Sequence, residues 1–275
     1  MSPTIVYVAC ADSHEIAVLR LDPASGGIER VQQVGTGGKV MPLAVSRDRR
    51  RLYASIRSAP LAVLSFAIDP ADGTLAALGT SPLPASMCWI GLDRSDRWLL
   101  SASYGESLVA VSPIGDDGVA GAARQTLGTP PNAHSIQTDP ANRVAFAACL
   151  GGDVIPAFAF DAATGTLGPL PEPAWRTRAG AGPRHFAFHP TAPFVYLLNE
   201  LDATVDALDH PADAVRFGHV QTIASMPPGG VGKPWAADIH FSPDGRFLYT
   251  SERRSSTLAA FAVDPQGGWL TLVGR

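Results

Sequence analysis

Short runs in which apolar and polar residues alternate recur along the chain, and polar turns separate them. Alternation with a period of two residues predicts β-strands with one buried face. Five segments share one pattern, which is an alternating run, a polar turn and a second apolar run: 41–55, 88–103, 134–149, 184–200 and 237–253. One residue at the start of each polar turn serves as the anchor for comparing the repeats: Ser46, Asp93, Asp139, His189 and Ser242. Successive anchors are 47, 46, 50 and 53 residues apart. The chain is therefore predicted to consist of one repeated unit.

A second pattern lies between these segments and consists of two strands joined by a turn rich in Asp, Pro and Gly. It occurs six times, at 17–28, 62–75, 108–119, 155–167, 204–215 and 258–270. Turns of this composition close β-hairpins. One period thus holds four antiparallel strands, which is typical of a propeller blade. A stacked solenoid is the alternative, and the four-strand meander in each repeat disfavours it.

The number of strands in each repeat bears on how the propeller closes. The last three strands of the blade occur six times, beginning with IVYVAC at 5–10, whereas the first strand occurs five times. The chain ends at LTLVGR, in a fourth strand. We therefore predict an all-β chain that forms a single β-propeller domain, 1–275, of about six four-stranded antiparallel blades. Either these blades close without a strand from the opposite end, or the chain is a shortened form of a longer propeller.

Equivalent positions of the repeat show where unusual residues gather. In a blade the first strand lies innermost, and its start and the loop after the second strand open on the same end of the central channel. The positions five and four residues before the anchor hold Met41, Cys88, His134, Arg184 and Ala237, and Pro42, Trp89, Ser135, His185 and Asp238. The position after the second strand holds Ala11, Arg57, Tyr104, Leu150, Glu200 and Arg253. We expect the polar members of these sets to form a site at one mouth of the channel.

Simpler interpretations exist for some of these residues. A single Arg at a strand end is most often a solvated surface residue, and His189 stands where other repeats have Asp or Ser, as a turn former. Four residues depart from their equivalents and map to one mouth, which predicts a catalytic set of His134, Arg184, Glu200 and Arg253. The polar residues beside them are predicted to bind substrate, namely Arg57, Tyr104, His185 and Asp238.

Composition and charge narrow the possible partners. Apolar residues make up 46% of the 275 residues and charged residues 17%, so a large core is expected. The net charge of −4 argues against nucleic acid as a partner. The N-terminus does not resemble a signal peptide and no apolar run is long enough to cross a membrane, so we expect a cytoplasmic protein. The three cysteines lie in apolar segments that are predicted to be strands, and we expect them to be reduced, buried thiols. Nothing in the sequence indicates an oligomeric state.

The predicted catalytic set could hydrolyse an ester without a metal or another cofactor. Glu or His would take a proton from the attacking water, one Arg would stabilise the oxyanion, and a second Arg would hold an anionic group of the substrate. The sequence has no G-x-S-x-G elbow and no zinc-ligand spacing. A nucleotide site at GTGGK, 35–39, is disfavoured because that segment runs into a strand.

Three strings carry a resemblance to a known family: GAGPRHFAFHP (180–190), YLLNEL (196–201) and WAADIHFSPDGRFLYTSER (235–253). They resemble the propeller-type lactonase family, also called the cycloisomerase 2 family, whose best-known member is the bacterial 6-phosphogluconolactonase. The resemblance runs along essentially the whole chain and implies a seven-bladed propeller. Members continue for about one more blade, whose final strand closes the ring. That last blade and the closing strand are therefore expected to be missing here.

The resemblance also implies an activity and a site. In a relative that interconverts carboxymuconate and its lactone, the proposed site is one His, two Arg and one Glu, which fall here on His134, Arg184, Arg253 and Glu200. The leading hypothesis is hydrolysis of 6-phosphogluconolactone to 6-phosphogluconate, with Arg57 or Arg253 holding the phosphate. The alternatives are a lactonase or lactonising cycloisomerase for another substrate, a metal-dependent lactonase using Glu200 and Asp238, and a non-catalytic binding propeller.

Overall fold

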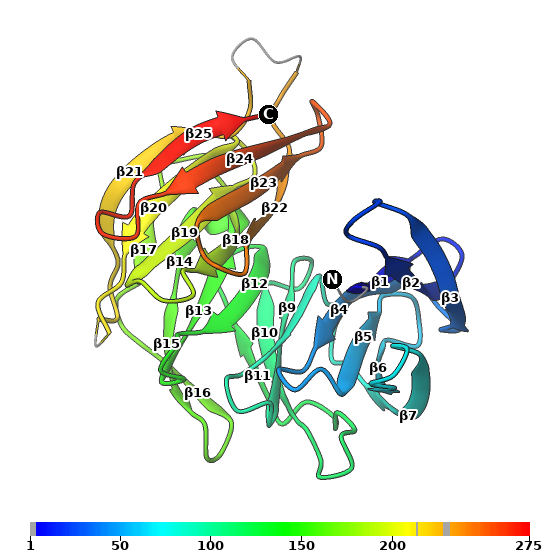
Figure 1. Ribbon diagram of the computed structural model, residues 1–275. Helices are drawn as coiled ribbons and strands as arrows, with labels where there is room; N and C mark the ends of the chain where they lie inside the picture. Colours follow the sequence, from blue (N-terminus) through cyan, green and yellow to red (C-terminus); the bar gives the residue numbers. More distant parts are fainter. Residues whose placement is uncertain (1–3, 213, 228–231) are drawn as a thin grey trace. The chain divides into compact units, whose positions relative to one another are not determined.

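The computed structural model describes residues 4–212, 214–227 and 232–275, and Asp213 of one predicted hairpin lies outside them. The chain is an all-β propeller, and its described strands form six antiparallel sheets (Figure 1). These residues divide into two compact units: the first comprises the described residues up to 127 and residues 161–166, and the second comprises 128–160 and the described residues from 167 onward. No helix in the described ranges is long and apolar enough to span a membrane.

The first unit holds the first three sheets. The first sheet has three strands, β1 (Thr4–Cys10), β2 (Glu15–Leu21) and β3 (Ile28–Gly35). The second sheet has β4 (Val40–Val45), β5 (Arg51–Ile56), β6 (Ala62–Ile68) and β7 (Leu75–Pro82). The third has β8 (Trp89–Leu92), β9 (Trp98–Ser103), β10 (Leu108–Pro113) and β11 (Gln125–Gly128). The predicted lack of a first strand in the opening repeat is confirmed by the three-stranded first sheet.

The second unit holds the other three sheets. The fourth has β12 (Ala133–Thr138), β13 (Val144–Cys149), β14 (Val154–Ile155), β15 (Ala157–Asp161), β16 (Thr166–Pro169) and β17 (Trp175–Arg176). A short 3₁₀-helix, η1 (Leu150–Gly152), connects β13 to β14. The fifth has β18 (Pro183–Phe188), β19 (Phe194–Asn199), β20 (Thr204–Asp209) and β21 (Gly218–Ala224). The sixth has β22 (Ala236–Phe241), β23 (Phe247–Glu252), β24 (Thr257–Val263) and β25 (Leu270–Gly274).

The fourth sheet differs from the predicted four strands because it contains six. Pro156 separates β14 from β15, and Pro171 and Pro173 lie between β16 and β17. Proline cannot donate a backbone hydrogen bond to a neighbouring strand, so it interrupts the ladder. The third and fourth strands of this blade are therefore each present in two pieces.

The repeat anchors shape the turn between the first two strands of a blade. Asp93 and Asp139 each accept two backbone N–H groups of that turn through Oδ1, at 2.7–3.0 Å. Ser46 and Ser242 accept one such group through the hydroxyl. Nδ1 of His189 accepts the N–H groups of residues 191 and 192, which confirms His189 as a turn former. These residues occupy the anchor position because each carries a short-range acceptor.

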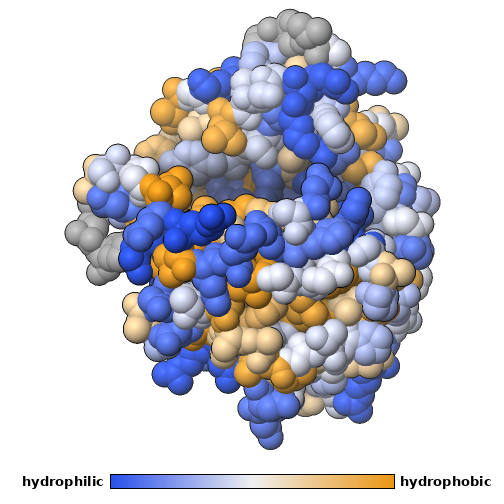
Figure 2. Space-filling view, turned by 90° about the vertical axis from the view of Figure 1, so that its right-hand side faces the viewer, coloured by the Kyte–Doolittle hydropathy of each residue, from blue (hydrophilic) through white to orange (hydrophobic). Residues whose placement is uncertain are grey.

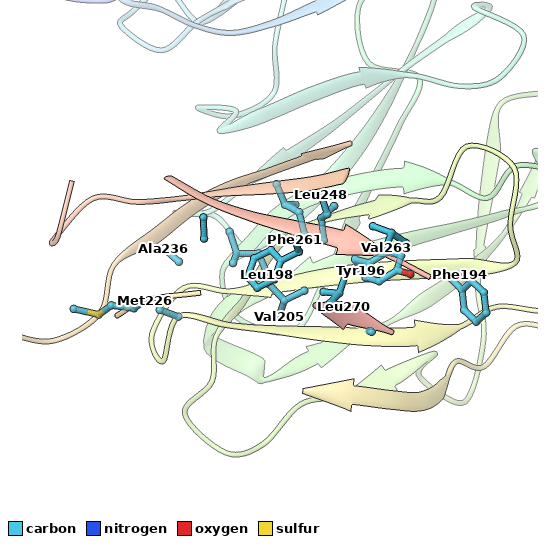
Figure 3. Packing of buried hydrophobic residues seen from close by; sticks show 14 residues of the cluster. Phe194, Tyr196, Leu198, Val205, Met226, Ala236, Leu248, Phe261, Val263 and Leu270 are labelled. Atoms are coloured by element: carbon cyan, nitrogen blue, oxygen red, sulfur yellow. The ribbon is translucent and has the colours of Figure 1, made fainter. Parts of the chain in front are cut away.

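Apolar side chains of neighbouring sheets interlock to form the core. In the second unit, one cluster joins the fifth and sixth sheets, and Figure 3 shows its side chains pointing toward one another between the strands. Tyr196, Leu248 and Phe261 are fully buried there. Large apolar residues at the surface are scattered, and Figure 2 shows hydrophilic residues around smaller apolar groups on the face in view. None of the three cysteines forms a disulfide; Cys149 is buried, whereas Cys10 and Cys88 are partly exposed, contrary to expectation.

A tyrosine on the second strand ties one sheet to the hairpin of the next sheet within each unit. The hydroxyl groups of Tyr7, Tyr53 and Tyr196 donate to the carbonyl oxygens of Gly73, Gly118 and Gly268, at 2.8–3.0 Å. The φ angles of Gly73, Gly118 and Gly268 are +79°, +80° and +74°, and residues with a Cβ disfavour this conformation. The tie therefore requires both residue types, Tyr on the strand and Gly in the turn.

We expect Tyr196→Phe to lower the free energy of unfolding by about 1–2 kcal/mol, because the buried carbonyl of Gly268 loses its donor. Tyr249 occupies the equivalent position of the sixth sheet and is 43% exposed, so Tyr249→Phe is the matched control, with a change within about 0.5 kcal/mol. Urea unfolding followed by tryptophan fluorescence measures both. Equal losses for the two variants would contradict the proposed role of the tie.

Candidate active site

The four predicted catalytic residues lie at the starts of first strands and the ends of second strands in the second unit. His134 and Arg184 sit on β-bulges near the starts of β12 and β18, and Glu200 and Arg253 directly follow β19 and β23. β22 has a similar bulge that includes Asp238. A bulge puts an extra residue opposite one partner residue and turns its side chain away from the ladder. The bulges therefore aim the polar side chains away from the regular sheet.

Glu200 forms the centre of the site. Its Oε2 lies 2.7 Å from Nε of Arg184 and 3.0 Å from Nη2 of Arg253. The side chains of Glu200 and Arg184 are each 13% exposed, and that of Arg253 is 34% exposed. Charge-assisted contacts of this length hold both guanidinium groups against one carboxylate. The site therefore combines a carboxylate with two cationic donors in a mostly buried position.

The backbone of Glu200 is fixed by two neighbouring segments. Its N–H donates to the carbonyl of Gly182 at 2.7 Å, and its own carbonyl accepts the N–H of Ala236 at 3.1 Å. Gly182 has φ +70° and leaves no room for a Cβ, which would lie 2.6 Å from Leu201. Asp153 accepts the N–H groups of Gly180 and Gly182 at 2.7 and 2.9 Å and so orders this loop. The turn that supports Glu200 thus accounts for the two glycines of the GAGPRH string.

Arg253 is held by Trp235 as well as by Glu200. The guanidinium Cζ lies 3.8 Å from the centre of the Trp235 ring, and Nε donates to the Trp235 carbonyl at 3.1 Å. Nη2 also donates to the carbonyl of Ala236 at 3.3 Å. A cation over an aromatic face is attracted by the negative face of the ring. These contacts leave Arg253 with a fixed orientation beside Glu200.

His134 is an uncharged member of the site. Its ring packs edge-on against His185, with 5.0 Å between ring centres. Burial, together with the nearby Arg184 guanidinium, lowers the pKa of His134 to about 2. A base with so low a pKa takes a proton poorly near neutral pH. Of the two predicted bases, His134 is therefore disfavoured, which leaves Glu200.

Asp238 joins two histidines in a chain of hydrogen bonds. Its Oδ1 lies 2.8 Å from Nδ1 of His185, and its Oδ2 lies 3.0 Å from Nε2 of His240. An ionised carboxylate only accepts, so both imidazole nitrogens carry protons and donate. Burial acts to raise the pKa of Asp238, but the hydrogen bonds from the two histidines outweigh it and hold this pKa well below its usual value. His240, 74% exposed, has its pKa raised by Asp238.

His185 and Asp238 are predicted substrate-binding residues, and the structure brings both close to the catalytic set. His185 is 8% exposed and lies between His134 and Asp238. Burial is the main cause that lowers the pKa of His185. Because His185 is buried between its two neighbours, this placement favours a positioning role for it. The Asp238 side chain is 46% exposed. Substrate contact by either residue stays a prediction.

The stability of the protein is expected to fall in acid partly through His134. Its ordinary pKa is 6.5 and its folded pKa is about 2, so between these values the unfolded chain binds a proton that the folded chain does not. Stability therefore rises with pH across this window, by about 1.4 kcal/mol per pH unit for one such group. His134→Asn should lower the slope of unfolding free energy against pH by about that amount between pH 4 and 6. Urea titrations at several pH values measure this slope, and parallel profiles for both proteins would refute it.

Arg57 and Tyr104 belong to the first unit and follow β5 and β9 there. Nε of Arg57 lies 3.3 Å from Oγ of Ser86, and the Arg57 N–H donates to the carbonyl of Lys39. Tyr104 is 40% exposed. Their predicted contact with substrate stays a prediction.

Three further residues support the site and were not predicted: Trp235, His240 and Glu252. Glu252 is 3% exposed and accepts the N–H groups of Trp235 at 2.6 Å, Arg254 at 3.1 Å and Ser255 at 2.5 Å. Burial acts to raise the pKa of Glu252, but the hydrogen bond from the Ser255 hydroxyl, together with those from the three N–H groups, outweighs it and lowers this pKa. A sequence signal exists, because the last position of the second strand is polar in three repeats, as Ser103, Asn199 and Glu252.

Metal binding by side chains was one of the alternatives. Across the described ranges, no group of three or more His, Cys, Asp or Glu residues is arranged to hold a metal ion. The predicted ligands Glu200 and Asp238 are instead engaged by two arginines and two histidines.

The repeated antiparallel sheets and the charged cluster at their strand ends define a β-propeller with a polar site. The profile of the family described as "Lactonase, 7-bladed beta-propeller" matches residues 5–275. A curated protein of Serratia proteamaculans named 6-phosphogluconolactonase is 43% identical over 270 residues, covering 98% of this chain and 80% of that protein. A protein of the same name from Pectobacterium carotovorum is 42% identical over 271 residues, with the same coverage. The chain therefore belongs to the lactonase family of seven-bladed β-propellers.

A solved structure extends this similarity to three dimensions. The periplasmic gluconolactonase of Pseudomonas aeruginosa matches with a TM-score of 0.90 at 28% sequence identity, over 99% of this chain and 82% of that one. The predicted family is thus confirmed, and the predicted propeller fold with it.

Proposed function

We propose that the protein is a lactone hydrolase that converts 6-phosphogluconolactone to 6-phosphogluconate. The observation that carries the proposal is a carboxylate, Glu200, held between the guanidinium groups of Arg184 and Arg253 in a chain of the lactonase family. The names of relatives that are 40–43% identical over nearly the whole chain favour this substrate. No metal or other cofactor takes part in the proposed reaction.

In the proposed reaction Glu200 acts as the general base. It takes a proton from a water molecule while that water attacks the lactone carbonyl carbon. Arg184 stabilises the negative charge that develops on the carbonyl oxygen. The tetrahedral intermediate then collapses, the ring C–O bond breaks, and the proton on Glu200 passes to the leaving alkoxide. The products are one carboxylic acid group and one hydroxyl group, which balances the addition of one water.

His134 and His185 have supporting parts in this proposal. A neutral His134 can exchange hydrogen bonds with the substrate without adding charge to the site. His185 and Asp238 fix the local orientation through their 2.8 Å hydrogen bond. The cytoplasmic location predicted from the sequence is retained in the proposal, because a phosphorylated sugar acid does not readily cross a membrane. Cell fractionation tests that location.

The test is acid release from fresh 6-phosphogluconolactone, followed by continuous titration with base and corrected for spontaneous hydrolysis. The proposal expects release that is proportional to protein concentration. Glucono-lactone and a carboxymuconolactone run in parallel distinguish the named substrate from other lactones. Rates equal to the spontaneous rate for all three would refute lactonase activity and favour a non-catalytic binding propeller.

A further inference from the structure

A cavity lies next to the Glu200 site in the second unit. It has a volume of about 560 Å³, and its lining consists of Gly180, Leu201, Lys233, Pro234, Trp235 and Arg254. Two of these residues connect it to the site: Leu201 follows Glu200 in the chain, and Trp235 stacks on Arg253. The Trp235 residue therefore contributes to both the cavity and the support of Arg253.

The cavity lining is cationic. Lys233 and Arg254 come from segments on either side of β22 and β23, and Nε of Arg254 approaches the carbonyl of Lys233 at 3.4 Å. Among the residues that the structure describes, none that lines the cavity is acidic. The carboxylate nearest in sequence to Arg254 is Glu252, whose oxygens accept the three N–H groups named above. Leu201 is flanked by two carboxylates, and both are paired: Glu200 with the two arginines of the site, and Asp202 with Arg178.

A buried carboxylate supports two of the residues that line the cavity. The buried Glu252 fixes the backbone of both Trp235 and Arg254 through hydrogen bonds of 2.6 and 3.1 Å. Its carboxylate thus joins the two segments that bring an aromatic ring and a cation to the same cavity. Such an arrangement suits an anion on a ring-shaped ligand, because cations hold the anion and the aromatic ring packs against the ligand's apolar face.

We propose that this cavity is the subsite that binds the phosphate of the substrate, with Lys233 and Arg254 as its cationic ligands. The inference rests on the proposed function and deepens it. The lactone group itself is neutral, so the phosphate is the only anionic part of the proposed substrate. With the phosphate in this cavity, the lactone end can extend past Trp235 toward Glu200 and Arg184. Lys233 and Arg254 then take the role that the sequence assigned to Arg57 or Arg253.

The experiment compares Lys233→Gln and Arg254→Gln with the wild-type protein on two substrates, 6-phosphogluconolactone and glucono-lactone. Losing one charge-assisted contact is expected to raise KM for the phosphorylated lactone about tenfold more than KM for glucono-lactone. Arg246→Gln is the charge-matched control, because Arg246 is exposed and lies outside the cavity lining. An equal rise for both substrates, or a rise as large in the control, would overturn the inference.

A binding measurement separates failure of this inference from failure of the proposed function. Titration calorimetry with 6-phosphogluconate and with gluconate reports binding without turnover. The inference expects the wild-type protein to prefer 6-phosphogluconate and each cavity variant to lose about tenfold of that affinity. If the wild-type protein hydrolyses neither lactone, the proposed activity fails while this titration still tests the cavity. No preference for the phosphorylated acid, or unchanged affinity in both variants, would overturn the phosphate subsite.

Discussion

Glu200→Gln is expected to lower kcat for lactone hydrolysis by about 10²–10⁴-fold, the usual contribution of a general base. The amide keeps the size of the side chain and one oxygen acceptor for the guanidinium groups of Arg184 and Arg253. It cannot take the proton from water. Base-release titration at saturating substrate, with the spontaneous rate subtracted, measures the loss.

The control for this variant is Glu172→Gln, because Glu172 is an exposed residue of the same unit. Its rate is expected to match that of the wild-type protein within twofold. A thermal melt of Glu200→Gln shows whether the fold survives the loss of a charge that two cations share. A cooperative melt with an unchanged kcat would remove Glu200 from the role of base.

Phe261→Ala is expected to lower the free energy of unfolding by about 3–5 kcal/mol. Phe261 is fully buried on β24 and contributes to the cluster that joins the fifth and sixth sheets (Figure 3). Removing the ring leaves a cavity between two rigid sheets, which have little freedom to collapse into it. Equilibrium urea unfolding measures the change.

Leu258→Ala on the same strand is the matched control, because Leu258 is 67% exposed. Its expected change is within about 0.5 kcal/mol. Similar losses for the two variants would mean that burial between the sheets is not the main source of stability in this part of the second unit.

Much of the fold could be predicted because the same pattern of strands and turns recurs several times along the chain. The repeats share the alternation of apolar and polar residues, a Ser, Asp or His acceptor at the turn in five of them, and the composition of the hairpin. An ambiguous segment in one repeat can therefore be interpreted from the others. The broken strands of the fourth sheet show the limit. Pro156, Pro171 and Pro173 are visible in the sequence, but the alternating pattern continues across them and hides the interruption.

The site could be predicted in part for the same reason. Aligned positions identified His134, Arg184, Glu200 and Arg253, because a residue that departs from its own repeat is conspicuous. The contacts of these residues could not be predicted. Whether Glu200 is paired, and whether His134 is charged, depends on distances of a few ångströms and on burial, which residue spacing does not encode.

Supporting residues were harder still to recognise. Glu252 precedes Arg253, and its polar type at the end of the second strand is its one signal in the sequence; it fixes Trp235 and Arg254 from 17 and two residues away. That signal does not show what the carboxylate does, because its role depends on the backbone N–H groups around it. Those groups come from separate segments that the fold brings together.

The bulges at the starts of β12, β18 and β22 have a consequence for the side chains that these positions can hold. His134, Arg184 and Asp238 lie opposite no partner residue in the ladder, so strand pairing does not restrict the residue type there. An imidazole, a guanidinium group and a carboxylate can therefore stand on the bulges of three blades that otherwise share one pattern of strands.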